Sequence, residues 1–166
     1  MSLYRQLWAS ILVSMLIALA ASLFAVLFNG RIYLEKQLSI KNRDNAAALA
    51  LAMGQQDLGA DGLVVAVTAQ FNSGQYEYIQ INDPQGRSIV ERIAPGAAPE
   101  VPRWFIRLLP IRPAPGVAQI SSGWQQVGSI VLMSQSRFAY RDLWDGALSL
   151  CGVMLAAGLL GGGLGT

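Results

Sequence analysis

The stretch "QYEYIQINDPQGRSIVERI", residues 75–93, carries the clearest secondary-structure signal in the chain. Its first part alternates polar or aromatic residues with isoleucines, as a half-buried β-strand does. In the middle, Pro84 fixes φ and Gly86 can adopt a positive φ, which is the chemistry of a tight turn. The segment "SIVERI" then returns as a partner strand. The stretch therefore predicts an antiparallel hairpin.

A second hairpin is predicted further along the chain. The segments "VAQIS" and "VGSIVLMSQS", residues 117–121 and 127–136, are rich in β-branched residues. Between them lie Gly123 and Trp124, among polar neighbours. The sequence thus places a large aromatic side chain at the tip of a hairpin.

Helices are predicted around the two hairpins. Residues 31–56 indicate a helix that continues from the apolar N-terminal run, with strong helix propensity in the alanines near its centre. Residues 60–74 favour a short helix, although Val64, Val65 and Val67 would also suit a strand. Residues 103–109 fit a strand or two helical turns, with Pro102 at the first helical position.

The last helix is predicted over residues 137–150. The resulting order of helix, helix, strands, helix, strands, helix predicts a small PAS-like α/β (α+β) domain with antiparallel hairpins. We expect its third helix to contribute core residues under the sheet, with contact to a membrane or a partner as the alternative. The expected core residues are Trp104, Phe105, Leu108 and Leu109.

Both ends of the chain are apolar. Hydrophobic residues make up 53% of the sequence and charged ones only 13%, which is more apolar than a typical soluble domain. No charge interrupts residues 6–30, and about 20 apolar residues suffice to cross a bilayer as a helix. No small-residue cleavage site follows this run, so we predict an uncleaved transmembrane helix rather than a signal peptide.

A second uncharged run covers residues 146–166 and ends in glycines. We interpret it as the truncated start of a second transmembrane helix. The expected organisation is therefore a first transmembrane helix at 1–30, a middle domain at 31–145 and the second helix from 146 onward. Basic residues follow the first span, but long domains cross membranes regardless of charge, so charge does not decide the orientation.

The chemistry of the middle domain excludes several classes of protein. The sequence has no histidine, and its one cysteine, Cys151, lies in the second apolar run, so no Ser-His-Asp triad or His-containing zinc site exists. All but one of the 12 Lys and Arg residues and all 10 Asp and Glu residues fall within 31–145, leaving it nearly neutral, which is atypical of a nucleic-acid-binding domain. We predict that this chain is not an enzyme.

Trp124 is the candidate functional residue that remains. It has no apolar neighbours in the sequence with which to form a local core. Tryptophan is over-represented among residues that dominate binding energy, although single exposed apolar residues are common. From the residues alone, a partner-binding anchor and a folded-back core residue are equally favoured.

Five blocks in one order resemble the N-terminal part of the LapD family. They are "MSLYRQLW", "YLEKQLSIKNRDNAAALALAM", "AQFNSGQYEYIQINDPQG", "VPRWFIRLLPI" and "GWQQVGSIVLMSQSRFAYRDLW". The resemblance implies a bacterial inner-membrane receptor with its middle domain in the periplasm. It also implies a homodimer with exchanged helices. HAMP, degenerate GGDEF and EAL domains would follow in the cytoplasm.

In that family, cyclic di-GMP binds the EAL domain, and the periplasmic domain then sequesters LapG, a calcium-dependent cysteine protease that clips a biofilm adhesin. The resemblance implies that Trp124 after Gly123 contacts the protease, with Gln125 and Gln126 as rim contacts. No cofactor is expected in this chain, because the nucleotide would bind the cytoplasmic part. The alternative is an inward-signalling sensor that binds a small ligand, in a histidine kinase or an active GGDEF or EAL enzyme.

Signal transmission to the periplasmic domain would use the helices that continue from the membrane. We expect the relay residues to lie on these two helices, at 31–56 and 136–150. The candidates are Lys41, Arg43, Asp44, Arg137 and Tyr140.

Overall fold

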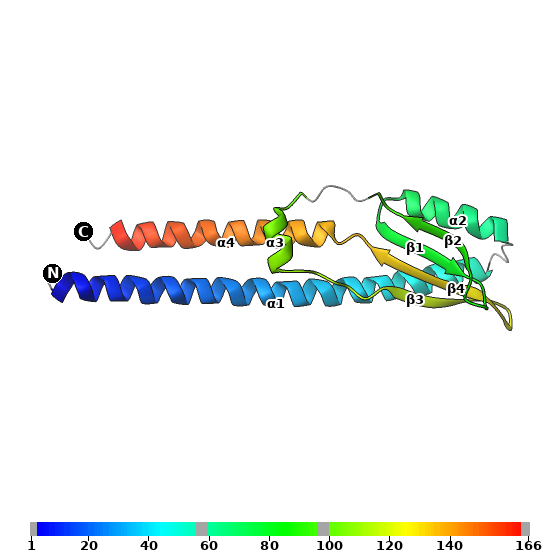
Figure 1. The fold of residues 1–166 in the computed structure, drawn as a ribbon, viewed down its shortest axis with the longest axis horizontal. Helices are drawn as coiled ribbons and strands as arrows, with labels where there is room; N and C mark the ends of the chain where they lie inside the picture. The colour runs from blue at the N-terminus through cyan, green and yellow to red at the C-terminus, as the bar shows by residue number, and fades with distance from the viewer. Residues whose placement is uncertain (1–2, 56–59, 96–99, 164–166) are drawn as a thin grey trace.

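The computed structural model describes residues 3–55, 60–95 and 100–163. Two long helices run side by side from the chain termini, and a sheet with a further helix lies at their far end (Figure 1). The first long helix, α1 (Leu3–Gln55), is unbroken over 53 residues. This confirms the predicted helix that continues out of the apolar run; Gln56, its predicted last residue, lies outside the described residues.

By length and composition, the described residues contain one helix able to cross a membrane. It is Gln6–Gln55, with a mean hydropathy of 2.8 in its most apolar window. The last helix, α4 (Arg137–Gly163), includes the described part of the second apolar run, and its role as a second span stays a prediction. So does the division of the chain at residues 30 and 145.

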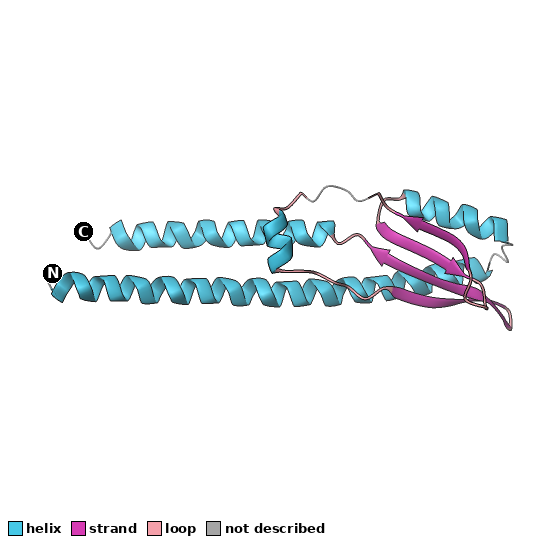
Figure 2. Cartoon of the chain, viewed as in Figure 1, coloured by secondary structure: helices cyan, strands magenta, loops and turns pink. Residues whose placement is uncertain are grey.

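The sheet has four antiparallel strands in the order β2-β1-β4-β3 (Figure 2). Two hairpins build it, and their bounds are β1 (Tyr76–Asn82), β2 (Ser88–Ile93), β3 (Gly116–Ser122) and β4 (Gln125–Ser134). The turn of the first hairpin contains Gly86 at φ +82°, as its sequence predicted. The α2 helix (Ala60–Asn72) is the predicted short helix. The predicted α+β class with antiparallel hairpins is confirmed.

One hydrophobic core lies between the sheet and the helices α1 and α2. Alternate residues of each strand face it, as the two-residue period of a strand requires. Ile79 and Ile130 are completely buried there, and Val67 of α2 joins them. The other buried members are Ala46, Ala50, Met53, Leu63, Tyr76, Ile81, Val90, Ile120 and Leu132.

A second core lies between the two long helices and the short helix α3 (Arg103–Leu108), which crosses them (Figure 1). Its buried residues are Val101, Phe105, Leu109, Ile111, Ala139, Leu143 and Ala147.

The expectation that four residues around α3 fill the core under the sheet is therefore wrong. Phe105 and Leu109 are buried in this second core instead, while Trp104 and Leu108 are 59% and 57% exposed. The cause is geometric, because a helix of under two turns can bury only one stripe of side chains. Pro102 lies at the N-cap, one residue before its predicted position.

A candidate partner-binding tip and its connection to the membrane helix

A two-residue turn, Gly123 and Trp124, joins β3 to β4 at the end of the molecule furthest from the chain termini (Figure 1). Gly123 has φ +59°, and the preferred two-residue hairpin turns need a positive φ at this position. The Trp124 side chain is fully exposed, at 105% of its reference area. The structure therefore excludes a folded-back core residue within this chain. Gln125 and Gln126, the predicted rim residues, are exposed beside it.

The base of this hairpin is bent. Ile120 pairs with Gly128 but Ser121 pairs with Gln126, so Val127 is an extra residue in β4. A bulge of this kind increases the local twist of a hairpin. The side chain of Val127 packs against the first core, which fixes the hairpin at the bulge. The tip is thus exposed, while the residues just below it are anchored.

The C-terminal end of α1 supports this hairpin through two glycines. A Cβ on Gly54 would lie 2.2 Å from the Ser121 carbonyl oxygen, and one on Gly116 would lie 1.9 Å from the Asn42 carbonyl oxygen. Only glycine allows backbones to approach this closely. The contacts follow the same order along both elements, so α1 and β3 run in the same direction, backbone against backbone.

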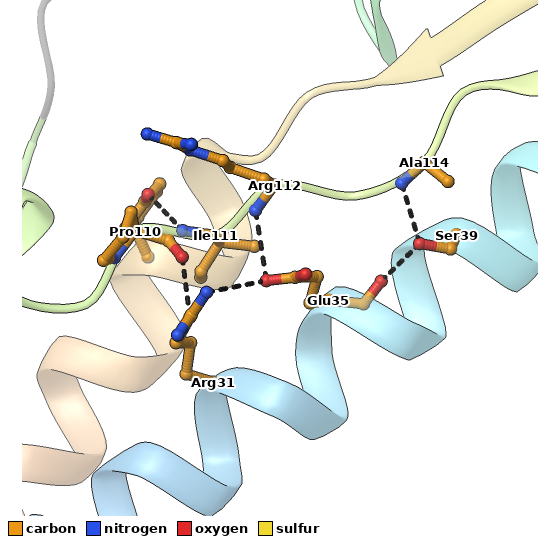
Figure 3. A network of polar contacts seen from close by, with 8 residues as sticks. Arg31, Glu35, Ser39, Pro110, Ile111, Arg112 and Ala114 are labelled. Atoms are coloured by element: carbon orange, nitrogen blue, oxygen red, sulfur yellow. Dashed lines mark hydrogen bonds and ion pairs between the residues drawn. The ribbon is translucent and has the colours of Figure 1, made fainter.

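The segment between α3 and β3, residues 109–115, is called the strap. Polar side chains of α1 bind its backbone (Figure 3). The Nε of Arg31 donates to the Pro110 carbonyl oxygen at 2.6 Å. The Arg112 backbone N–H donates to Oε2 of Glu35 at 3.2 Å, and the Arg31 guanidinium forms an ion pair with the same oxygen at 3.3 Å. The salt bridge orients both side chains toward the strap.

The contacts continue one turn further along α1. The Ala114 backbone N–H donates to Oγ of Ser39 at 2.9 Å. Asn42, which is fully buried, donates from Nδ2 to the Ala114 carbonyl oxygen and accepts from the Ser134 N–H of β4. One turn of helix and two extended residues both advance the chain by about 6 Å, so successive turns of α1 meet alternate strap residues.

No sequence motif marks these four side chains as a functional set. They follow one another on α1 at spacings of four, four and three residues, which places them on one face. That spacing was the only available signal, because their partners are backbone atoms. We call Arg31, Glu35, Ser39 and Asn42 the α1 ladder.

Among the predicted relay residues, Tyr140 lies against the strap. Its hydroxyl oxygen accepts a hydrogen bond from the Ile111 backbone N–H at 2.7 Å, so it joins α4 to the segment that the α1 ladder holds. Arg137 is exposed, and its guanidinium carbon lies 4.8 Å from the centre of the Phe138 ring. Arg137 and Tyr140 both border a cavity of about 240 Å³ beside β1.

The other predicted relay residues are exposed on α1. Lys41 and Asp44 line a groove of about 560 Å³ between α1 and α4, with Asp142 on the opposite wall. Arg43 is exposed and does not line this groove, although its backbone N lies close to Gly116. The structure thus places Lys41 and Asp44 at one groove and Arg43 outside it, and the relay role of all three stays a prediction.

Within the described residues, two titratable groups have shifted pKa values, and both lie on the first hairpin. Burial raises the pKa of the Tyr78 hydroxyl, and the negative charge of Glu91 raises it further. For Asp83, desolvation raises the pKa, but hydrogen bonds and the charge of Arg87 outweigh it and lower the pKa below its ordinary value. The hydrogen bonds that Asp83 accepts from Gln85 and Arg87 stabilise the turn between β1 and β2. In the part of the chain that the structure describes, no group of three potential metal ligands occurs.

Comparison with known proteins identifies the family. The family model of the LapD/MoxY periplasmic domain matches residues 23–144. A solved structure of the periplasmic domain of LapD from Pseudomonas fluorescens is 35% identical; the match covers 68% of this chain and 89% of that one, with a TM-score of 0.35. Curated proteins gave no match. The assignment rests on the family model and the sequence identity, and it confirms the resemblance: the chain belongs to the LapD/MoxY periplasmic domain family.

Proposed function

We propose that this chain is the periplasmic output part of an inner-membrane receptor that sequesters a LapG-type calcium-dependent cysteine protease. Cyclic di-GMP, bound by cytoplasmic domains, would control the capture and thereby adhesin retention and biofilm formation. The observation that carries the proposal is the fully exposed Trp124 on an anchored hairpin. A homodimer with exchanged helices belongs to the same proposal.

The physical argument concerns where the binding energy comes from. A tryptophan buries about 150–250 Å² when it enters a pocket, and such residues contribute about 2–4 kcal/mol at interface centres. Trp124 is fully exposed and the turn is fixed by Gly123, so the side chain is presented before binding. Little conformational entropy of the backbone is then lost on association.

The contacts of α1 support a proposal for the route of control. One continuous helix connects the apolar run with the base of the tip hairpin, and the α1 ladder and Gly116 join this helix to the strap and to β3. We infer that movement of α1 relative to α4 displaces the whole β3–β4 hairpin. Switching then depends on the arrangement of two rigid parts, with no change within the hairpin itself.

The test exchanges Trp124 for glutamate in the full chain and measures binding of the calcium-loaded protease. We expect a loss of affinity of about 30-fold or more. The thermal stability should not change, because the side chain is exposed in the free protein. Trp124→Phe should lose less, since part of the apolar area remains.

The matched control is Val117→Glu, which adds the same charge to an exposed apolar position of the same hairpin. We expect it to bind as the unaltered chain does. Equal binding by Trp124→Glu would refute the anchor role. Equal losses in both variants would show that charge on the hairpin, and not the tryptophan, controls binding.

A further inference from the structure

The short helix α3 lies at the level where both long helices change from polar to apolar. On α1, Arg31 follows the uncharged run that ends at Gly30. On α4, Asp145 is the last charge before the second apolar run. The two boundaries coincide, because a Cβ on Gly30 would lie 3.1 Å from Cδ1 of Leu143. Phe105 of α3 packs at this level, with its ring 5.0 Å from that of Trp144.

The orientation of α3 is also defined. It crosses the two long helices (Figure 1), so it lies in the plane of a membrane that those helices would enter along their axes. The strap that follows it is held by the bond from Arg31 to Pro110. Helices that bind the surface of a membrane adopt this orientation, with aromatic and aliphatic side chains inserted and basic ones among the headgroups.

The outer surface of α3 has the matching composition. Trp104 and Leu108 form one exposed apolar pair, and Arg103 and Arg107 form an adjacent exposed basic pair. Within residues 3–55, 60–95 and 100–163, neither arginine has an ion-pair partner. The Trp104 ring packs edge-on against Trp144 at 5.8 Å, which fixes its position at the surface.

We propose that α3 is a membrane-contacting foot. Trp104 and Leu108 insert into the interfacial region of the periplasm-facing leaflet, and Arg103 and Arg107 bind its anionic phospholipid headgroups. Trp and Arg suit this interface because each combines an apolar part with a polar end. The foot fixes the tilt of the strap and of α1 over the bilayer. The inference rests on the membrane anchoring of α1 proposed above and is independent of the protease.

The experiment places a nitroxide label on single cysteines of the full chain in nanodiscs, with Cys151 replaced by alanine. Leu108→Cys reports on α3, Val65→Cys on the exposed surface of α2, and Leu16→Cys on the apolar run of α1. The readout is the ratio of collision rates with oxygen, which concentrates in lipid, and with a water-soluble nickel complex. All three side chains are exposed, so the labels do not disturb packing.

We expect the labels at 108 and 16 to favour oxygen and the label at 65 to favour nickel. In nanodiscs with anionic lipid, Arg103→Gln should shift the equilibrium of the label at 108 toward water by about fivefold at low salt, as expected for one arginine at an anionic surface. The matched control Arg43→Gln should have no effect, because that exposed side chain lies more than three turns beyond the boundary on α1.

Three outcomes would overturn the proposal. If the label at 16 is in lipid but that at 108 is in water, α1 spans the bilayer and α3 does not touch it. If the label at 16 is in water, the anchoring itself fails, and the foot with it. If the label at 108 becomes protected only when a periplasmic protein is added, the surface binds a protein instead.

Discussion

Replacing Asn42 with leucine should destabilise the domain by about 2–4 kcal/mol. Asn42 is fully buried and connects three segments, since it belongs to α1, donates to Ala114 of the strap at 2.8 Å and accepts from the Ser134 N–H at 2.9 Å. Leucine has a similar volume but makes neither bond. The Ser134 N–H, in a residue only 4% exposed, then has no access to water.

The magnitude follows from the two lost bonds. An unsatisfied buried N–H costs about 1–3 kcal/mol, and the bond to the exposed Ala114, whose carbonyl can recruit water, contributes about 1 kcal/mol. In a folded unit of this size, 1 kcal/mol lowers the melting temperature by about 4 °C. We therefore expect a decrease of about 8–16 °C for Asn42→Leu.

The assay is thermal unfolding of the full chain in detergent, followed by near-ultraviolet circular dichroism, together with hydrogen exchange at the Ser134 amide. Asn45→Leu is the matched control, because Asn45 is half-buried on the same helix and lines the groove between α1 and α4. We expect it to change the melting temperature by less than about 2 °C. A decrease below about 3 °C for Asn42→Leu, or a Ser134 amide that stays protected, would refute the reasoning.

Two further variants test the packing and the turn. Gly116→Ala should destabilise the chain by about 2 kcal/mol or more, because its Cβ would lie 1.9 Å from the Asn42 carbonyl oxygen. The control is Gly146→Ala, whose Cβ meets open space, so this variant should be neutral or stabilising. Equal melting temperatures of the two variants would contradict the close approach of α1 and β3. Asp83→Asn should lower the melting temperature at neutral pH, because Asp83 accepts hydrogen bonds from Arg87. The pKa of Asp83 in the folded chain lies below its ordinary value of 3.8, so this stabilisation is complete above pH 3.8 and is lost as the pH falls through the folded pKa. The melting temperatures of the unaltered chain and of Asp83→Asn should therefore converge in acid. A difference in melting temperature that stays constant with pH would exclude the carboxylate as the cause.

The sequence predicted the elements whose signals are local. The turn at Pro84 and Gly86, the alternation in β1 and the uncharged run of α1 depend on neighbouring residues, and the structure contains the predicted turn, strand and helix. That the helix spans a membrane stays a prediction. Trp124 was undecided because a lone aromatic between polar residues fits an anchor and a core residue alike. Its exposure depends on whether any other segment reaches the tip, which is a tertiary property.

The α1 ladder shows why other features of the structure could not be predicted from the sequence. Arg31, Glu35 and Ser39 resemble ordinary polar residues on the exposed face of a helix. Their partners are backbone atoms more than 70 residues away, and a backbone atom leaves no signal in the sequence. The wrong assignment of Trp104 and Leu108 has a related cause, since which stripe of α3 is buried depends on where α1 and α4 lie.

The length of the unbroken α1 helix also determines how far the β3–β4 hairpin lies from the end of the apolar run. From Arg31 to Gln55 it rises about 36 Å, and the tip hairpin leaves the domain at its upper end. Because no joint interrupts the helix, α1 anchored in a membrane as proposed would hold the tip at this clearance, which could not shorten or lengthen by flexing. A compact protein of 200 residues is about 40 Å across, so a partner held at the tip would work one protein diameter above the bilayer. In the proposed receptor, the length of α1 would thereby select which surface structures such a partner can reach.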